Sequence, residues 1–277
     1  MKLGKKTAAI ALGLLLAVSM TACGGTEESA GDIPTALEKI NAVKSMDATM
    51  VMEMDMGIMG QAMETETTMN MSCFNDPVKL KADMTMDMGQ LGSMDMSMYA
   101  AMDGDNYTVY LYDGTAWTAQ TVDMSALQQY DAQESMNLYL ESAEDYTQDG
   151  TEEINGSTAN KFTGVIRGDA LEEVLANSGA TSSLESSTGG MDLSDLYSDL
   201  GDLPVTVWVD QESGYPVRYA MDMTAMMQGI MEKALAASAS ETDTSGMVTI
   251  DKVTMVMDCF NFDNVADFEI PAEALAA

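Results

Sequence analysis

Methionine alternates with polar residues in several stretches of the chain. In residues 49–56, Thr-Met-Val-Met-Glu-Met-Asp-Met, methionine stands at every second position, with acidic or small residues between. Because successive side chains of a β-strand point to opposite faces, this pattern predicts a ribbon with one sulfur-rich apolar face and one polar face. The alternation returns at Met69/Met71, Met84/Met86/Met88, Met94/Met96/Met98, Met221/Met223 and Met255/Met257. Several such strands indicate an antiparallel sheet with one covered face.

The remaining pattern completes an α+β chain. Helical spacing of apolar residues predicts helices over 33–45, 124–145 and 225–239, and a short one after a variant capping box at 169–172. Alternation bounded by turn residues predicts strands over 47–59, 63–74, 78–88, 93–102, 106–112, 115–120, 147–155, 158–166, 205–210, 215–224 and 247–262. Segment 177–190 is rich in serine, threonine and glycine, and we expect it to be a mobile loop. Composition shows no division into two cores, so residues 33–277 are predicted to form one domain.

The N-terminus has the features of a bacterial lipoprotein signal. Three lysines precede an apolar run of about eleven residues, which is shorter than the ~20 needed to span a bilayer. Met20-Thr21-Ala22-Cys23 resembles a lipobox, in which the cysteine is acylated and becomes the new N-terminus. This resemblance implies a signal peptide over 1–22 and a lipid anchor at Cys23. The small, polar residues after it predict a flexible tether over 23–32.

Removal of the signal makes an acidic chain more acidic. Segment 1–22 holds three of the 12 basic residues and none of the 45 acidic ones, so nine basic residues remain and the formal net charge becomes −36. Such a charge repels nucleic acid and anionic lipid headgroups. We therefore expect no nucleic-acid partner, and expect most of the carboxylates to lie on solvated faces.

Two further cysteines have matching surroundings. Met69-Asn-Met71-Ser-Cys73-Phe parallels Met255-Val-Met257-Asp-Cys259-Phe, and each cysteine shares parity with its strand's methionines. Both should therefore face inward. Export would permit a disulfide between Cys73 and Cys259 if their strands are neighbours. Two small buried hydrophobic side chains are the alternative.

Catalytic and metal chemistry find little support. The chain has no histidine, which excludes Ser-His-Asp and Cys-His arrangements and histidine metal sites. Acidic pairs are too frequent to single out a general acid or base. We expect no enzyme activity, no cofactor and no metal site.

Three segments together resemble a family of uncharacterised lipoproteins from Gram-positive bacteria. They are the helix-to-strand passage from Ala36 to Met56, the hairpin Val205–Val217 and the ending Asn261–Pro271. That family is similar to the LolA, LppX and LprG lipoprotein carriers. The resemblance implies an antiparallel, incompletely closed β-barrel packed on helices, with an apolar cavity. It also implies a location on the outer face of the cell membrane.

The methionine stripes suggest what such a cavity would bind. Methionine is unbranched and polarizable, and surfaces made of it adapt to varied apolar ligands. Burying a twelve-carbon chain at ~0.8 kcal/mol per CH₂ would contribute on the order of 9 kcal/mol before the costs of binding. The candidate cavity residues are Met52, Met54, Met71, Met86, Met96, Met221, Met223 and Met255.

Other roles for these methionines stay open. The same faces could pack on the helices as an ordinary core, and thioethers also suit Cu(I). The function expected is non-enzymatic binding of a lipid or lipid-linked envelope component. The alternative is an envelope scaffold whose barrel is filled by its own side chains.

Overall fold

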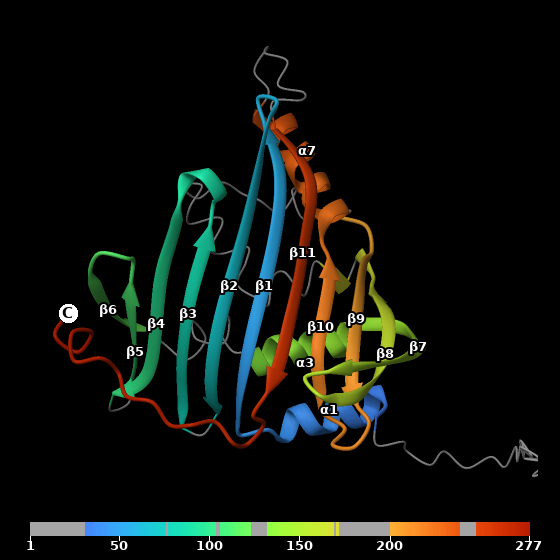
Figure 1. The fold of residues 1–277 in the computed structure, drawn as a ribbon, viewed down its shortest axis with the longest axis horizontal. Helices are drawn as coiled ribbons and strands as arrows, with labels where there is room; N and C mark the ends of the chain where they lie inside the picture. Colours follow the sequence, from blue (N-terminus) through green and yellow to red (C-terminus); the bar gives the residue numbers. More distant parts are fainter. Residues whose placement is uncertain are drawn as a thin grey trace, which may run out of the picture.

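One antiparallel sheet of 11 strands forms most of the molecule (Figure 1). The computed structural model describes residues 31–75, 77–103, 106–122, 132–168, 170–171, 200–238 and 248–277. The strands are β1 (Ser45–Ile58), β2 (Gln61–Asn75), β3 (Val78–Asp87), β4 (Ser93–Asp103), β5 (Asn106–Tyr112), β6 (Trp117–Val122), β7 (Ala143–Ile154), β8 (Ser157–Ile166), β9 (Leu203–Asp210), β10 (Pro216–Asp222) and β11 (Val248–Phe260). The predicted signal peptide, the loop at 177–190 and all of the tether except Gly31 and Asp32 lie outside the described residues.

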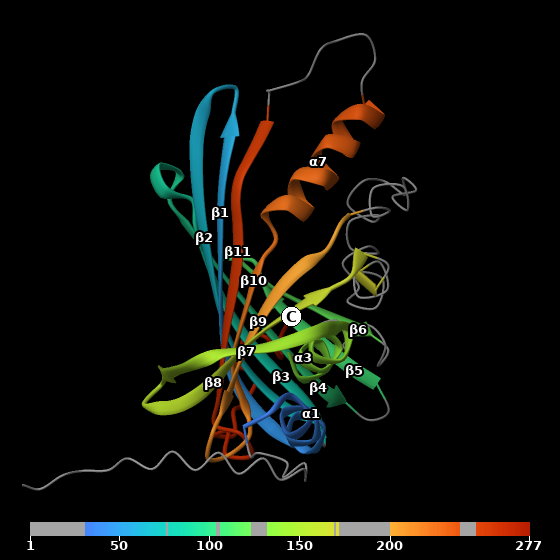
Figure 2. The ribbon, with the colours of Figure 1, turned by 90° about the vertical axis from the view of Figure 1, so that its right-hand side faces the viewer.

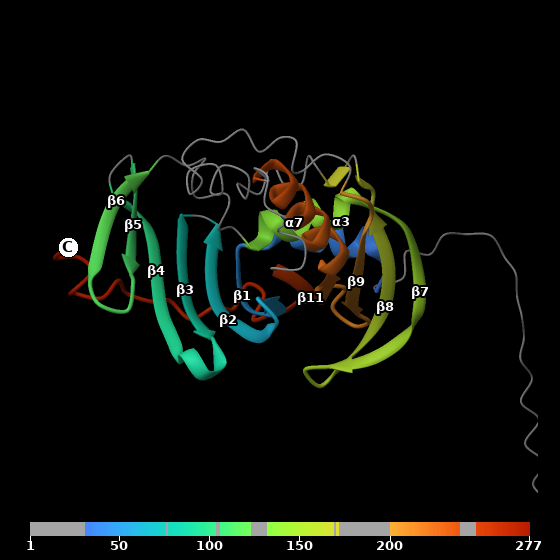
Figure 3. The ribbon, with the colours of Figure 1, turned by 90° about the horizontal axis from the view of Figure 1, so that it is seen from above.

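Two meanders meet in the middle of the sheet. The strand order is β6-β5-β4-β3-β2-β1-β11-β10-β9-β8-β7, so each half follows the chain and β1 joins β11 at the centre. This pairing runs from Asp47 opposite Phe260 to Ile58 opposite Val248. The outermost strands, β6 and β7, do not pair with each other, and the sheet curves as an open arc (Figure 3). The predicted α+β class with an incompletely closed antiparallel barrel is therefore confirmed.

Helices lie on the concave side of this arc (Figure 3). They are α1 (Ile33–Ala42), α3 (Ala132–Ser142) and α7 (Thr224–Ser238), and a short 3₁₀ helix, η1 (Gly89–Leu91), connects β3 to β4. The start of α1 is capped by the Asp32 carboxylate, which accepts a hydrogen bond from the Thr35 backbone N–H at 2.9 Å. Its apolar stripe of Ile33, Ala36 and Ile40 is buried.

The point where the chain enters α1 is also fixed by polar contacts. The side-chain amide of Asn160 on β8 donates to the Gly31 carbonyl at 2.9 Å, and Gln211 donates to the Asn160 carbonyl oxygen at 2.7 Å. Asn160 is buried, so these bonds satisfy a polar group that would otherwise be costly. The chain N-terminal to α1 therefore leaves the fold beside β8 and the β9–β10 turn.

The two faces of the sheet differ as the alternation predicts. On the inner face, Met46, Cys73 and Leu80 are opposite one another across three strands and are buried with α1 and α3 in the main core. On the outer face, hydroxyl and carboxylate side chains bond across strands. The Ser72 hydroxyl donates to Asp47 at 2.6 Å, for example.

The helix predicted over 124–145 is wrong at its C-terminal end. Helix α3 stops at Ser142, and residues 143–145 already belong to β7, where Ala143 pairs with Ile166. Met136, Leu140 and Ala143 are all buried, so the apolar spacing is that of the core, but it continues across the helix–strand boundary. Pairing with β8 decides the conformation there. Residues 123–131 lie outside the described part of the chain.

Candidate functional site

Methionines form continuous rows across the inner face of the sheet. Met257, Met50, Met69, Met84 and Met96 are successive cross-strand partners on β11, β1, β2, β3 and β4. A neighbouring row runs through Met221, Met255, Met52, Thr67, Met86 and Met94 on β10, β11 and β1–β4. Directly opposite residues in an antiparallel sheet share a face, with Cβ atoms about 4.5–5.5 Å apart. We call this surface the methionine face.

Burial decreases along each row. In the first row Met257 is 4% exposed, whereas Met50, Met69, Met84 and Met96 are half-buried. In the second row Met221 and Met255 are 4% and 7% exposed, Met52 and Met86 are half-buried, and Met94 is 42% exposed. The β10–β11 side of the methionine face is thus core, and the β1–β4 side keeps apolar surface accessible.

The methionine rows carry no charged residue. Along the described strands β9, β10, β11 and β1–β4, Asp, Glu, Lys and Arg occupy outward positions, with the exception of Asp251 at the bulge of β11. Outward charges pair with one another, as in the bidentate contact of Arg218 with Asp258 and the bond between Lys252 and Glu53. A ligand on the inner face would therefore meet thioethers, methyl groups and a few threonine hydroxyls.

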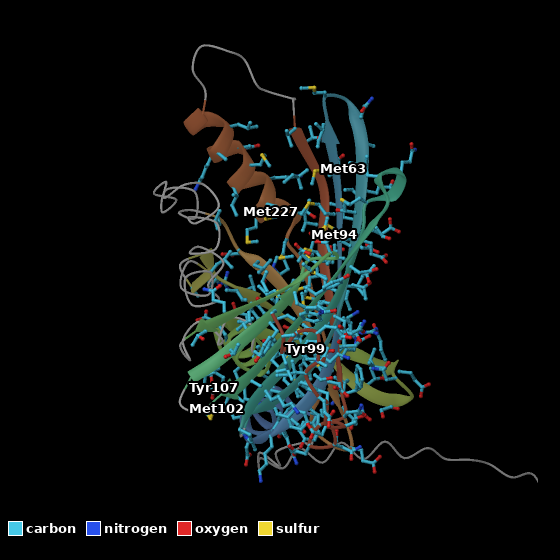
Figure 4. The ribbon with its side chains drawn as sticks, turned by 90° about the vertical axis from the view of Figure 1, so that its left-hand side faces the viewer. Met63, Met94, Tyr99, Met102, Tyr107 and Met227 are labelled. Atoms are coloured by element: carbon cyan, nitrogen blue, oxygen red, sulfur yellow. The ribbon has the colours of Figure 1, made fainter. Side chains whose placement is uncertain are left out.

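Helix α7 covers one part of this face. The Gln228 side chain donates to the Ile250 carbonyl at 2.7 Å, and the Met223 backbone N–H donates to the Val253 carbonyl at 2.9 Å. These bonds hold the start of α7 beside β11, where Met226 is buried against Met221. Towards its C-terminal end the helix diverges from the sheet (Figure 2). Figure 4 shows Met227 of α7 in the same upper part of the molecule as Met63 and Met94.

The structure brings the predicted cavity residues together. Seven of the eight lie on the methionine face, and Met223 follows β10 and packs with the α7 cluster. Met221 and Met255 are core residues, and Met71 packs at the edge of the main core. The half-buried members on the accessible β1–β4 side of the methionine face are Met52, Met54, Met86 and Met96.

Of the two alternatives for the cysteines, the structure has the two free thiols and not the disulfide. Cys73 and Cys259 are both buried thiols on the inner face, but β1 lies between their strands. Cys73 is opposite Met46 and Cys259 is opposite Ala48. Their strands are two spacings of about 4.8 Å apart, and a disulfide can bridge Cα atoms separated by at most about 7 Å. The alternative of two small buried hydrophobic groups fits, and the Cys259 Sγ lies 3.2 Å from the Met136 Sδ.

Titratable groups near the methionine face are neutral phenols and a thiol. Burial raises the pKa of Tyr219, Tyr146 and Tyr139 above that of an exposed phenol, and burial likewise raises the pKa of the Cys259 thiol. A thiol with a raised pKa is a poor nucleophile. Within the described ranges no group of three or more His, Cys, Asp and Glu side chains could hold a metal ion. No helix among these residues is long and apolar enough to cross a membrane.

A second apolar surface lies at the hairpin turns, where periodic sequence patterns do not predict it. The turn between β1 and β2 and the connection through η1 flank a groove of about 700 Å³ lined by Ile58, Met59, Met63, Met88 and Leu91, together with Gln61, Ala62, Glu64, Gly89 and Gln90. The signal was present in the sequence, because both segments lack charged residues in a chain that is 21% charged. Strand periodicity does not detect it, since the segments are turns.

Comparison with known proteins assigns a family and gives several similar folds. Residues 33–277 match the model of a family described as a family of unknown function (DUF6612). Among curated proteins the comparison found no match.

Solved structures similar to the chain include a lipoprotein and a LolA superfamily protein, in agreement with the sequence resemblance. Lipoprotein LppX of Mycobacterium tuberculosis is 16% identical, with 86% of this chain and 96% of LppX covered and a TM-score of 0.43. LprF of Mycobacterium bovis is 11% identical, with 87% and 95% covered and a TM-score of 0.46. A LolA superfamily protein of Nitrosomonas europaea is 9% identical, with 86% and 93% covered and a TM-score of 0.25.

Proposed function

We propose that this chain, which belongs to the family of unknown function DUF6612, binds a hydrophobic ligand with a long apolar chain on its methionine face. It does so without chemistry, at the outer side of a cell membrane to which acylated Cys23 anchors it. The ligand class is a lipid or a lipid-linked envelope component.

One observation carries this proposal: the methionine rows pass from buried to exposed without a charged residue. A face that served only as core would leave little apolar surface accessible, because full burial of one such side chain contributes about 1.5–3 kcal/mol of free energy. Here Met257 is 4% exposed while its row partners on β1–β4 are half-buried. An apolar ligand laid along β1–β4 would complete that burial.

The choice of methionine supports an apolar ligand of variable shape. A thioether chain has three rotatable bonds and repacks around different partners, where leucine or valine would present a fixed contour. A scaffold filled by its own side chains is the second candidate, favoured by the burial of Met221 and Met255 in the core.

The chain also fits a tethered carrier. The contact of Asn160 with Gly31 fixes where the N-terminal segment leaves the fold. A lipid on Cys23 would thus hold one domain, residues 33–277, near the membrane. Mass spectrometry of the N-terminal peptide from cells tests the anchor, since acylation adds a diacylglyceryl group to the Cys23 thiol.

Extraction of co-purified ligand tests the binding function. Protein in which an ordinary cleavable secretory signal replaces residues 1–23 would be exported without an anchor, purified without detergent and extracted with organic solvent for mass spectrometry. The carrier function predicts a near-stoichiometric lipid and saturable binding of a fluorescent fatty acid. An empty extract together with no binding of the fatty acid would favour the scaffold.

A further inference from the structure

Two neighbouring hairpins end in apolar segments without charge. Residues 56–63 read Met-Gly-Ile-Met-Gly-Gln-Ala-Met, and residues 88–94 read Met-Gly-Gln-Leu-Gly-Ser-Met. The flanking strands carry outward carboxylates up to the edge of these segments, at Asp55, Glu64, Asp87 and Asp95. Charge therefore stops where the hairpins turn. We call these two segments the apolar tips.

The apolar tips expose large side chains. Met59 and Leu91 are each 73% exposed, Met94 is 42% exposed and Ile58 is 39% exposed. These four are half of the eight large apolar side chains exposed among the described residues, so exposure is concentrated there. The groove of about 700 Å³ lies between the tips, which places them side by side. Both are at the end of the sheet opposite α1 (Figure 1).

The backbone of the first tip holds its methionine in a conformation that disfavours long side chains. Met59 and Gly60 have φ angles of 51° and 80°, the two positive values of a two-residue type I′ turn. The β7–β8 hairpin has the same geometry, with φ angles of 52° and 87°, and carries Asn155-Gly156. Asparagine is favoured in the left-handed region, whereas a long side chain there is strained. In the first tip, Met59 occupies this strained conformation and its side chain is exposed.

We propose that the two apolar tips dock on the surface of a zwitterionic lipid bilayer, with Met59 and Leu91 inserted at the boundary of headgroups and acyl chains. The tips have no cation to attract phosphate-rich surfaces, and the net charge of the mature chain repels anionic lipid. Insertion of apolar side chains is the attraction that remains. The tips comprise 15 residues, fewer than the 20–30 a side of a stable protein interface, which disfavours a second copy as the occupant.

Vesicle flotation tests the docking. The mature chain with Cys23→Ser, which has no acyl anchor, is mixed with phosphatidylcholine vesicles and the partition coefficient is measured. The tip variant is Met59→Asn with Leu91→Gln. The matched control is Met102→Asn with Leu275→Gln, since these residues are 50% and 60% exposed away from the tips. Met59→Asn alone should raise the melting temperature by a few degrees, because it restores the favoured turn residue.

The expected result is binding by the parent and control proteins and a loss of about tenfold for each tip side chain. Equal binding by the tip variant, or no flotation of the parent protein, would overturn docking. Concentration-dependent dimerisation that the tip variant abolishes would assign the tips to a second copy and also refute it. Binding of the fluorescent fatty acid separates this inference from the proposed function, since the tip variant should retain it.

Discussion

The methionine face can be tested by making it polar while keeping its shape. Glutamine has the length of methionine but ends in an amide, so Met84→Gln with Met86→Gln changes polarity at two half-buried positions. Thr85 lies between them on β3, points to the outer face and is exposed. Thr85→Gln is therefore a control on the same strand.

The size of the effect follows from burial. Full burial of a methionine is worth about 1.5–3 kcal/mol, so a ligand that covers the accessible half gains about 1 kcal/mol at each position. Each amide covered without a hydrogen-bond partner costs about 1 kcal/mol more. Together the two substitutions should weaken binding by about 4 kcal/mol, close to a thousandfold in Kd.

The assay is titration of a fluorescent fatty acid, with circular dichroism to verify folding. Met84→Leu with Met86→Leu should bind within a few-fold of the parent, since the wall stays apolar. If the glutamine variant bound as tightly as Thr85→Gln, the β1–β4 side of the methionine face would not be the binding surface.

Three further predictions concern the described core. The pKa of Asp210 is affected by burial, which raises it, and by hydrogen bonds from the Ser213 backbone and hydroxyl, which lower it further than burial raises it. The ionised Asp210 carboxylate therefore stabilises the folded protein above its ordinary pKa of 3.8, and this stabilisation is lost as pH falls through the lower pKa of the folded state. Asp210→Asn should reduce the free energy of unfolding, measured in urea, by about 1 kcal/mol at pH 7 but by much less at pH 3. The Tyr219 hydroxyl is buried without a hydrogen-bond partner among the described residues, and burial raises its pKa above 10. Tyr219→Phe should leave the free energy of unfolding unchanged or increase it by up to about 1 kcal/mol. The variant should also lose less stability than the parent protein above pH 10. Cys73 and Cys259 should both resist maleimide in the folded protein and should both react in guanidinium without reductant, measured by intact mass. If they reacted only after reduction, the two cysteines would form a disulfide.

Local patterns predicted the strands well, because the alternation of side chains between the two faces of a strand can be seen in neighbouring residues of the sequence. Segment 106–112 was predicted with both of its observed bounds. The end of α3 was missed because Ala143 suits a buried helical position and a buried strand position equally, and only pairing with Ile166 distinguishes them. The alternation also chose the inward face correctly for Met52 and Met86.

Partners and covering elements could not be predicted in the same way. Nothing near Met50 in the sequence indicates Met257 as its neighbour, and the matched surroundings of Cys73 and Cys259 suggested adjacent strands where β1 intervenes. Alternation also says which face is apolar without saying what covers it, so the decrease in burial from Met255 to Met94 had no local signal.

The pairing of β1 with β11 has a consequence for how the chain folds. The two strands are joined by roughly 200 residues of chain, and such non-local contacts form slowly because loop closure must precede them. Strands β1–β6 can pair in the order of synthesis, but the free edge of β1 stays unpaired until β11, the last strand, has been synthesised. During that interval the most methionine-rich ribbon of the protein presents unpaired backbone groups, a template for aggregation. A chaperone that binds this edge, or rapid completion of the C-terminal segment, would protect it, and truncation within β11 should leave the chain prone to aggregation.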